Sequence, residues 1–202
     1  MASVKKTFLD PLGKNNPVFA QILGICSTLA VTNVLENTVV MCLGVIFTTT
    51  LSGFTISLIR NYIPARIRMM VETMIIATFV IVVDVVLRAY QPEIWQQLGP
   101  YVGLIITNCI IMGRAEAFAL NNPPQLSLID GLASGIGYSY VLLVIAFFRE
   151  LLGSGTIWGI QVLGDWWTSW TIMIMPPGAF FMLAIFVWVV KGALIQEKEG
   201  AK

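Results

Sequence analysis

The chain has 202 residues, of which 57% are hydrophobic and only 11% are charged, with a formal net charge of +1. Soluble domains carry about 25% charged residues, so this composition excludes an ordinary soluble domain and predicts an integral membrane protein. The balanced charge gives no electrostatic basis for nucleic-acid binding. Histidine is absent, which excludes His-ligated haem, His-bound zinc and a histidine general base. The three cysteines all lie in apolar segments and do not form the pattern of a secreted disulfide framework.

The N-terminal stretch 1–16 is polar and contains Lys5, Lys6, Asp10 and Lys14. It lacks the apolar run and small-residue cleavage site of a signal peptide, so we expect the first apolar segment to be retained. Six apolar segments follow, at about 17–34, 38–60, 68–90, 99–118, 127–150 and 174–195. We therefore predict an all-α integral membrane protein with six transmembrane helices, forming a single membrane domain over residues 1–202.

The first and fourth segments are shorter than the others. The apolar run Val18–Thr32 would extend about 22 Å as a helix, and the run Tyr101–Gly113 ends at Arg114. Both are shorter than the roughly 30 Å hydrocarbon core. Each of them opens a group of three segments, 17–90 and 99–195. Paired short segments indicate a midplane site in membrane proteins built from inverted repeats, and an odd number of crossings would make the second group face the opposite way.

The sequence evidence that the two halves are repeats of one another is weak. The motif Ala77-x-Phe79-Val80-x-Val82-Val83 in the third segment matches Ala184-x-Phe186-Val187-x-Val189-Val190 in the sixth. Apolar sequence of low complexity produces such matches by chance, so the residues alone leave open whether the two halves are related.

Lysine and arginine are distributed unequally between the two sides of a six-helix topology. One side would carry ten of them, against two, Arg88 and Arg149, on the other. The ten are Lys5, Lys6, Lys14, Arg60, Arg66, Arg68, Arg114, Lys191, Lys198 and Lys202. Because cytoplasmic flanks are enriched in these residues, we expect both termini in the cytoplasm.

The connection between the fifth and sixth segments contains Trp158, Trp166, Trp167 and Trp170. Tryptophan concentrates at the membrane–water interface. We interpret this connection as lying on the outer membrane face, where it anchors the chain or contacts a ligand or a partner.

Cys26 and Cys109 lie near the middle of the two short segments. A cysteine in an apolar chain commonly packs as a small buried hydrophobe, and this is one interpretation of both. The other is half of a metal-cluster site. Small or polar residues flank the two thiols: Gly24, Ser27, Thr28, Thr107, Asn108 and Gly113. An iron–sulfur cluster held by cysteine needs four thiolates, so a second chain would have to supply the other two.

Cys42 lies in a full-length segment without such neighbours, and we expect it to pack.

Four acidic residues lie in or beside the apolar segments: Glu72, Asp84, Glu116 and Asp130. An ionisable group at membrane depth is a functional hypothesis by default. The alternative is neutralisation by a nearby base, and three pairs have suitable spacing: Glu72 with Arg68, Asp84 with Arg88, and Glu116 with Arg114. We expect Asp130 to cap the start of the fifth helix. Asp84 and Asp130 are the candidates for lining a cation path.

The glycine-rich stretch 131–137 lacks the Lys-Ser/Thr ending of a phosphate-binding loop. Small residues in a membrane segment allow helices to approach closely. We therefore predict that these glycines serve helix packing.

Several stretches of the chain resemble one family of membrane proteins: Asn15–Val18, Gln21–Cys26, Arg66–Met70, Ile75–Ala77, Val102–Ile110, Met112–Ala119 and Phe148–Gly155. This family contains the D-type component of the sodium-translocating NADH:quinone reductase (Nqr) and the E-type component of the Rnf complexes. The resemblance covers about residues 15–195, and its most specific strings are Thr-Asn-Cys and Gly-Arg-Ala-Glu-Ala-Phe-Ala. Ser27 after Cys26, the short tail after Lys191, and Val80–Asp84 favour the D-type component of Nqr over its Rnf relative.

The resemblance implies two inverted three-helix repeats, about 17–90 and 99–195, with the first helix of each broken into half-helices. It implies that Cys26 and Cys109 ligate half of a 2Fe-2S iron–sulfur cluster inside the membrane. A paralogous E-type Nqr component, in the opposite orientation, would complete the cluster. Electrons would pass from an NADH-oxidising subunit on the cytoplasmic side to a flavin on the outer side. NADH, flavins and quinone (ubiquinone) would be bound by other members of the six-subunit complex.

By this resemblance the chain would be an electron-transfer subunit of a sodium-pumping translocase in the bacterial inner membrane, and it would not be catalytic alone. Three alternatives stay open: the E-type component of an Rnf ferredoxin:NAD complex, a non-redox secondary transporter of inverted repeats, and a purely structural subunit. In the last two, both cysteines would be packing residues. The sequence does not distinguish Na⁺ from H⁺ as the transported ion.

Overall fold

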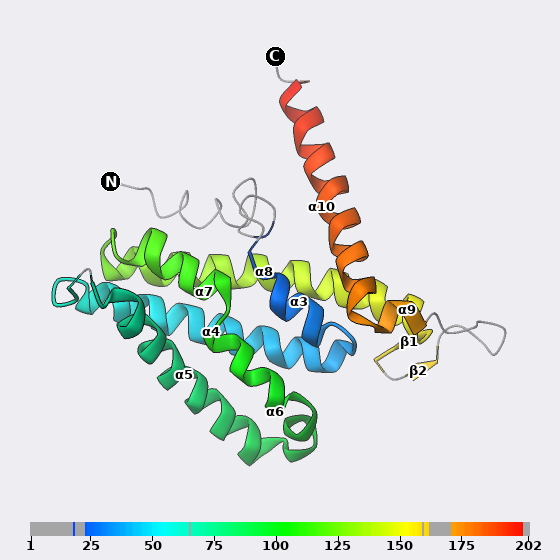
Figure 1. The fold of residues 1–202 in the computed structure, drawn as a ribbon, viewed down its shortest axis with the longest axis horizontal. Coiled ribbons are helices and arrows are strands. Elements are labelled where there is room, and N and C mark those ends of the chain that lie inside the picture. The colour runs from blue at the N-terminus through cyan, green and yellow to red at the C-terminus, as the bar shows by residue number, and fades with distance from the viewer. Residues whose placement is uncertain (1–17, 19–22, 65, 159, 162–170, 200–202) are drawn as a thin grey trace.

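The computed structural model describes residues 18, 23–64, 66–158, 160–161 and 171–199 (Figure 1). Within these residues the chain is an all-α membrane protein, apart from a short hairpin of β1 (Thr156–Ile157) and β2 (Ile160–Gln161). Four helical stretches are long and apolar enough to cross a bilayer: Leu35–Ile59, Arg68–Tyr90, Pro92–Ala119 and Pro124–Gly153. A shorter apolar helical stretch covers Pro176–Gly192.

The helices follow the predicted apolar segments. The second, third, fifth and sixth segments correspond to α4 (Leu35–Ile59), α5 (Arg68–Tyr90), α8 (Pro124–Gly153) and α10 (Pro176–Glu199). The first contains the short helix α3 (Ile25–Val31), and the fourth contains α6 (Pro92–Ile106), α7 (Cys109–Arg114) and a π-helical turn, η1 (Ala115–Ala119). A four-residue helix, α9 (Thr171–Ile174), precedes α10.

The prediction that the fourth segment is too short to span is wrong. Its helical stretch begins at Pro92, seven positions before the predicted start, and continues to Ala119. Proline is favoured at the first position of a helix because its missing N–H would have no partner there. The polar residues Gln96 and Gln97 lie in the first turns of this stretch. They resemble a loop in sequence, which is why the predicted segment started after them.

The helices α4 and α8 run antiparallel and form the centre of the fold (Figure 1). Gly131 and Gly135 of α8 lie directly against the α4 backbone. A Cβ atom added to Gly131 would lie 3.0 Å from the carbonyl oxygen of Thr49, and one added to Gly135 would lie 3.1 Å from Cα of Ile46. The prediction that these glycines serve helix packing is therefore confirmed.

Two threonine hydroxyls of α4 bond within their own helix. Thr49 and Thr50 donate hydrogen bonds to the carbonyl oxygens of Val45 and Ile46, at 2.6 and 2.7 Å. This local bonding removes the cost of placing a hydroxyl in an apolar medium. The helix α5 lies against α4 and α6, while α10 extends away from the α4–α8 pair (Figure 1).

Candidate functional site

The helical stretch 92–119 is interrupted immediately before Cys109. Asn108 has an extended backbone, with ψ of 118°, and this separates α6 from α7. Its side-chain oxygen then accepts a hydrogen bond from the N–H of Ile110 at 3.1 Å, which caps the new helix. The side chain of Asn108 is buried. The broken helix expected for the second half of the chain is thus present, and Cys109 is the first residue after the break.

The first thiol also follows a change of backbone direction. Gly24, at the start of α3, has a φ of 89°, in the left-handed region that side-chain-bearing residues rarely adopt. A Cβ atom at this position would lie 2.6 Å from Cε2 of Tyr138. Both the conformation and the space therefore require glycine. Cys26 lies two positions later, in the first turn of α3.

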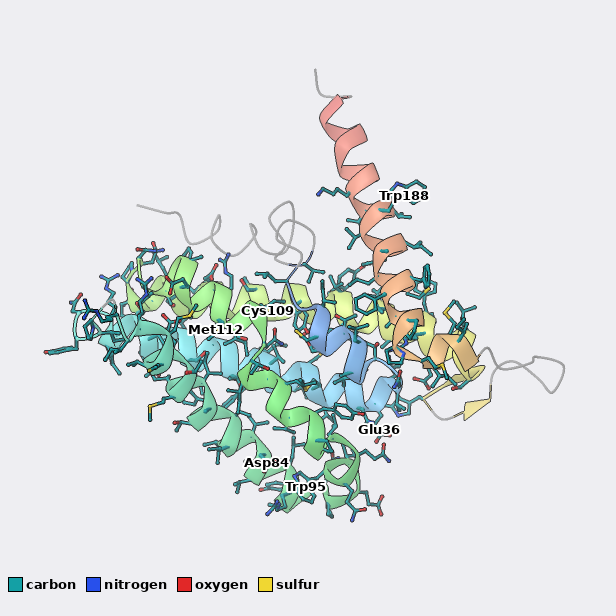
Figure 2. The ribbon with its side chains drawn as sticks, in the orientation of Figure 1. Glu36, Asp84, Trp95, Cys109, Met112 and Trp188 are labelled. Carbon is teal, nitrogen blue, oxygen red and sulfur yellow. The ribbon has the colours of Figure 1, made fainter. Side chains whose placement is uncertain are left out.

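These two helix starts bring the thiols together, although 83 positions separate them in the chain. The Sγ atoms of Cys26 and Cys109 are 3.8 Å apart. Both cysteines are free and exposed on the surface of this chain, and Figure 2 shows Cys109 at the start of α7, beside α3. A disulfide needs a separation of about 2.05 Å, so the sulfurs are in contact without being bonded.

The sulfur separation suits two ligands of one metal ion. Two thiolates at about 2.3 Å from a tetrahedral ion lie about 3.8 Å apart, and the observed distance is 3.8 Å. Among the described residues no group of three or more His, Cys, Asp or Glu side chains could hold a metal ion. This part of the chain therefore offers two thiol ligands and no third from those residue types.

A small polar network holds the two helix starts in position. The hydroxyl groups of Ser27 and Tyr138 are hydrogen-bonded, and the amide of Asn108 donates to Ser27 Oγ at 3.4 Å. Thr28 Oγ1 donates to the carbonyl of Gly24 at 2.9 Å. This network links α3, α7 and α8 directly beneath the cysteines. Tyr138 is fully buried and was missed in sequence, because one tyrosine in an apolar helix carries no signal of its partners.

Cys42 has a different environment. It is buried in the main apolar core, and its thiol contacts the carbonyl oxygen of Ser139 at 3.9 Å. This agrees with the prediction that Cys42 packs between helices.

Arg149 is a second residue that sequence reasoning undervalued. It is 2% exposed, near the end of α8, and its guanidinium donates to five oxygens. Two belong to α3 and its C-cap, the carbonyl of Leu29 and the hydroxyl of Thr32, and the other three are the carbonyls of Met173, Ile174 and Met175. Arg149 therefore ties the helix that carries Cys26 to the segment that leads into α10.

The predicted local charge pairs are wrong, because tertiary partners replace them. Arg68 forms an ion pair with Glu116 rather than with Glu72. Arg114 binds both carboxylate oxygens of Asp130 rather than Glu116, with its Nε at 2.9 Å from Oδ2. Asp130 is the seventh residue of the helix that starts at Pro124, so it is not a helix cap.

Asp84 also has a partner other than the predicted one. Its carboxylate accepts a hydrogen bond from Nε1 of Trp95 at 2.9 Å, and the guanidinium of Arg88 lies over the same indole ring at 4.2 Å. Figure 2 shows Asp84 and Trp95 close together, where α5 meets α6. Whether Asp84 or Asp130 lines a cation path stays a prediction, and both carboxylates have protein partners here.

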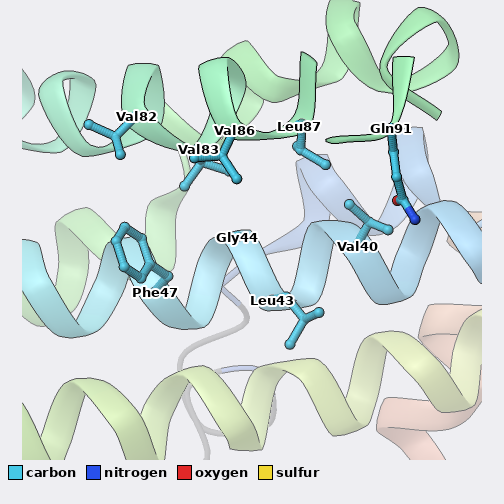
Figure 3. Close-up of a pocket in the computed structure, with 9 residues that line it drawn as sticks. All are labelled: Val40, Leu43, Gly44, Phe47, Val82, Val83, Val86, Leu87 and Gln91. Carbon is cyan, nitrogen blue, oxygen red and sulfur yellow. The ribbon is translucent and has the colours of Figure 1, made fainter. Parts of the chain in front are cut away.

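An apolar groove of about 330 Å³ lies between α4 and α5 (Figure 3). Its lining is hydrophobic apart from Gln91: Val40, Leu43, Gly44, Phe47, Val82, Val83, Val86, Leu87 and Gln91. Such a lining supplies contact for an apolar chain.

Part of the tryptophan-rich connection lies outside the described residues. Trp158 is exposed at the tip of the hairpin between β1 and β2, whereas Trp166, Trp167 and Trp170 fall in the range 162–170, which is not described. The interfacial role of this connection stays a prediction.

Fold and site together define a multi-pass α-helical membrane protein that presents two thiols at two helix starts. A family model described as "Rnf-Nqr subunit, membrane protein" matches residues 4–187, which is most of the chain. The chain belongs to the Rnf-Nqr family. Subunits of this family are parts of multisubunit membrane redox complexes, so this chain is a subunit of an electron-transport assembly.

Proposed function

We propose that this chain is the D-type component of a sodium-translocating NADH:quinone oxidoreductase. In this proposal Cys26 and Cys109 supply half of the ligands of an intramembrane 2Fe-2S cluster, and the paralogous E-type component supplies the rest. The observation that carries it is the 3.8 Å separation of two exposed, unbonded sulfurs. When bound, the cluster would supply one-electron transfer between the redox centres of the neighbouring subunits.

The residues of this chain have separate roles in the proposal. Cys26 and Cys109 hold iron through their thiolates. Gly24 and Asn108 set the backbone turns that aim the two thiols at one point. Ser27, bonded to Tyr138 and Asn108, fixes the spacing between the two helix starts.

Because the two sulfurs are exposed, a second protein chain could supply the remaining ligands of the site. Cys26 and Cys109 are exposed whereas the Ser27 and Asn108 side chains beside them are buried. A protein carrying a second thiol pair could therefore approach the sulfurs without displacing the supporting network. Two such pairs would give the four thiolates that a cysteine-ligated cluster requires.

The test uses the purified complex that contains this chain. Cys26→Ala and Cys109→Ala should each abolish the EPR signal of one reduced cluster, lower the bound iron, and reduce NADH-driven quinone reduction to background. Cys42→Ala is the matched control, since it removes a thiol from the apolar core and should leave the signal in place. A signal of full size in both Cys26→Ala and Cys109→Ala would overturn the proposal. That result would favour a transporter or a structural role for the chain.

The Nqr assignment needs a second measurement, because the Rnf-Nqr family covers both kinds of complex. Proteins that co-purify with this chain should oxidise NADH with quinone as acceptor and move Na⁺ into vesicles. Exchange of electrons between ferredoxin and NAD by the same preparation would assign the chain to the Rnf type instead. The proposal also includes a location in the bacterial inner membrane, with both termini of the chain in the cytoplasm.

A further inference from the structure

Glu72 is a buried acid that the proposed function does not use. It lies in the second turn of α5 and has 0% exposure. Neither of its carboxylate oxygens has a hydrogen-bond partner among the described residues. A buried carboxylate without a partner is strongly disfavoured, so its environment must supply a counter-charge or neutralise it.

A second acid lies near Glu72. Arg68 is one turn earlier on the same face of α5, and its ion pair with Glu116 brings η1 to this face. Arg68 donates to Oε1 of Glu116, while Oε2 of Glu116 is buried and also lacks a partner among the described residues. Two carboxylates are both acceptors, so they can bond to each other only when a proton lies between them.

Among the described residues no base other than Arg68 forms an ion pair with Glu72 or Glu116, and this includes Arg60 and Arg66 at the same end of α4 and α5. Arg114, on the adjacent α7, is bound to both oxygens of Asp130. A small apolar cluster packs η1 against α4 and α5: Ile56, Ile75, Ala115, Ala119 and Leu120. One guanidinium therefore faces two carboxyl groups, which leaves the site one negative charge in excess if both are ionised.

We propose that Glu72 and Glu116 form a proton-binding site, in which a single proton is held between the two carboxyl groups beside Arg68. Glu72 is then neutral and donates to Oε2 of Glu116, and Glu116 remains ionised and paired with Arg68. One proton then joins one oxygen of Glu72 to Oε2 of Glu116, and the site is electrically neutral. It uses no residue of the thiol pair.

The geometry favours a proton over a metal cation. A hard cation in a protein takes six or more oxygen ligands, whereas a proton needs only two acceptors. Three carboxylate oxygens are available, two on Glu72 and one on Glu116. The Arg68 and Glu116 side chains are 38% and 36% exposed, so the shared proton has a short path to the protein surface. Glu116 also lies in a π-helical turn, a feature frequent at functional sites.

The test is infrared spectroscopy of the purified complex at neutral pH, in the C=O region of protonated carboxylic acids. Glu72→Gln should remove one such band, and this band should shift in D₂O in the wild-type complex. Glu116→Gln should remove the same band although Glu72 is retained, because Glu72 then ionises and pairs with Arg68. Glu93→Gln, which removes an exposed carboxylate from α6, is the control and should leave the band unchanged.

Each other outcome contradicts the proposal. An unchanged band in Glu72→Gln would mean that Glu72 carries no proton. Loss in Glu72→Gln with retention in Glu116→Gln would mean that burial alone keeps Glu72 neutral and that no pair exists. Disappearance of the wild-type band on adding NaCl, but not KCl at equal ionic strength, would identify Na⁺ as the occupant. Glu72→Gln should also keep the thermal stability of the wild type, and a large loss would show that Glu72 is ionised.

Discussion

Asp130 is the residue whose role changes most between sequence and structure. Its sequence position suggested a helix cap or a cation ligand, but in the fold its two oxygens bind Nε and Nη2 of Arg114. The pair is largely buried, with 16% exposure for the Arg114 side chain and 4% for that of Asp130. Removal of one partner from a buried ion pair leaves an uncompensated charge, which is the costly case.

We therefore expect Asp130→Asn to destabilise the chain by about 3 kcal/mol, measured as the shift of the denaturant midpoint of the purified complex. The double variant Arg114→Met/Asp130→Leu should be less destabilised than Asp130→Asn, because it leaves no charge buried. If Asp130→Asn is as stable as the wild type but loses Na⁺ transport, Asp130 serves a cation path and the structural interpretation is wrong.

Individual functional residues were predictable to different degrees. Cys26 and Cys109 were recognisable as a candidate pair because small or polar residues flank both thiols, and the break before Cys109 agrees with this. The supporting residues Tyr138 and Arg149 were not recognisable as such. Their partners in and beside α3, Ser27 for Tyr138 and Thr32 for Arg149, are more than 100 positions away in the chain, and no local pattern encodes such contacts.

At the scale of elements, the packing of α8 on α4 determines where the thiols can meet. Contacts between the two helices pair Ser127 with Gly53 near one end and Ser139 with Cys42 farther along, which defines an antiparallel arrangement. A two-fold axis in the membrane plane would relate the second helices of two inverted repeats in this way. The packing therefore supports the proposed repeats, which stay a prediction.

This interface should be sensitive to a single methyl group. Gly131→Ala would place a Cβ atom 3.0 Å from backbone atoms of Thr49 and Thr50, which cannot move independently of α4. We expect a loss of about 1–3 kcal/mol, measured by denaturant titration of the purified complex.

Gly103→Ala is the matched control for this prediction. It lies in α6 with no atom within 4 Å of the new Cβ, and alanine favours a helix over glycine by about 1 kcal/mol. Its stability should be unchanged or higher. Equal destabilisation by both substitutions would show that the glycine effect is not specific to the α4–α8 contact.

At the scale of the whole molecule, α10 stands apart from the other long helices. It extends away from the α4–α8 pair (Figure 1), and much of its apolar surface is exposed, including Phe181 at 68% and Trp188 at 77%. Only the lipid bilayer or other subunits could cover such a surface in a membrane protein. This agrees with a chain that works inside a multisubunit membrane complex.

The charge distribution makes a prediction about the orientation of the molecule. Ten lysines and arginines on one side against two on the other should hold both termini in the cytoplasm. Green fluorescent protein fused after Lys202 should therefore fluoresce, and alkaline phosphatase fused at the same position should be inactive. The reverse pair of results would place the C-terminus outside and would rule out the topology with six crossings and two cytoplasmic ends.

The sequence by itself determined the class of fold. In lipid, each spanning helix must form its own backbone hydrogen bonds, so the helices appear in the sequence as long apolar runs. The sequence also distinguished Cys26 and Cys109, which have small or polar neighbours, from Cys42. Only the tertiary structure decided which groups meet: Cys26 with Cys109, Arg114 with Asp130, and Arg68 with Glu116. The physical reason is that helix periodicity positions side chains around one axis, whereas the crossing of separate helices positions them relative to each other.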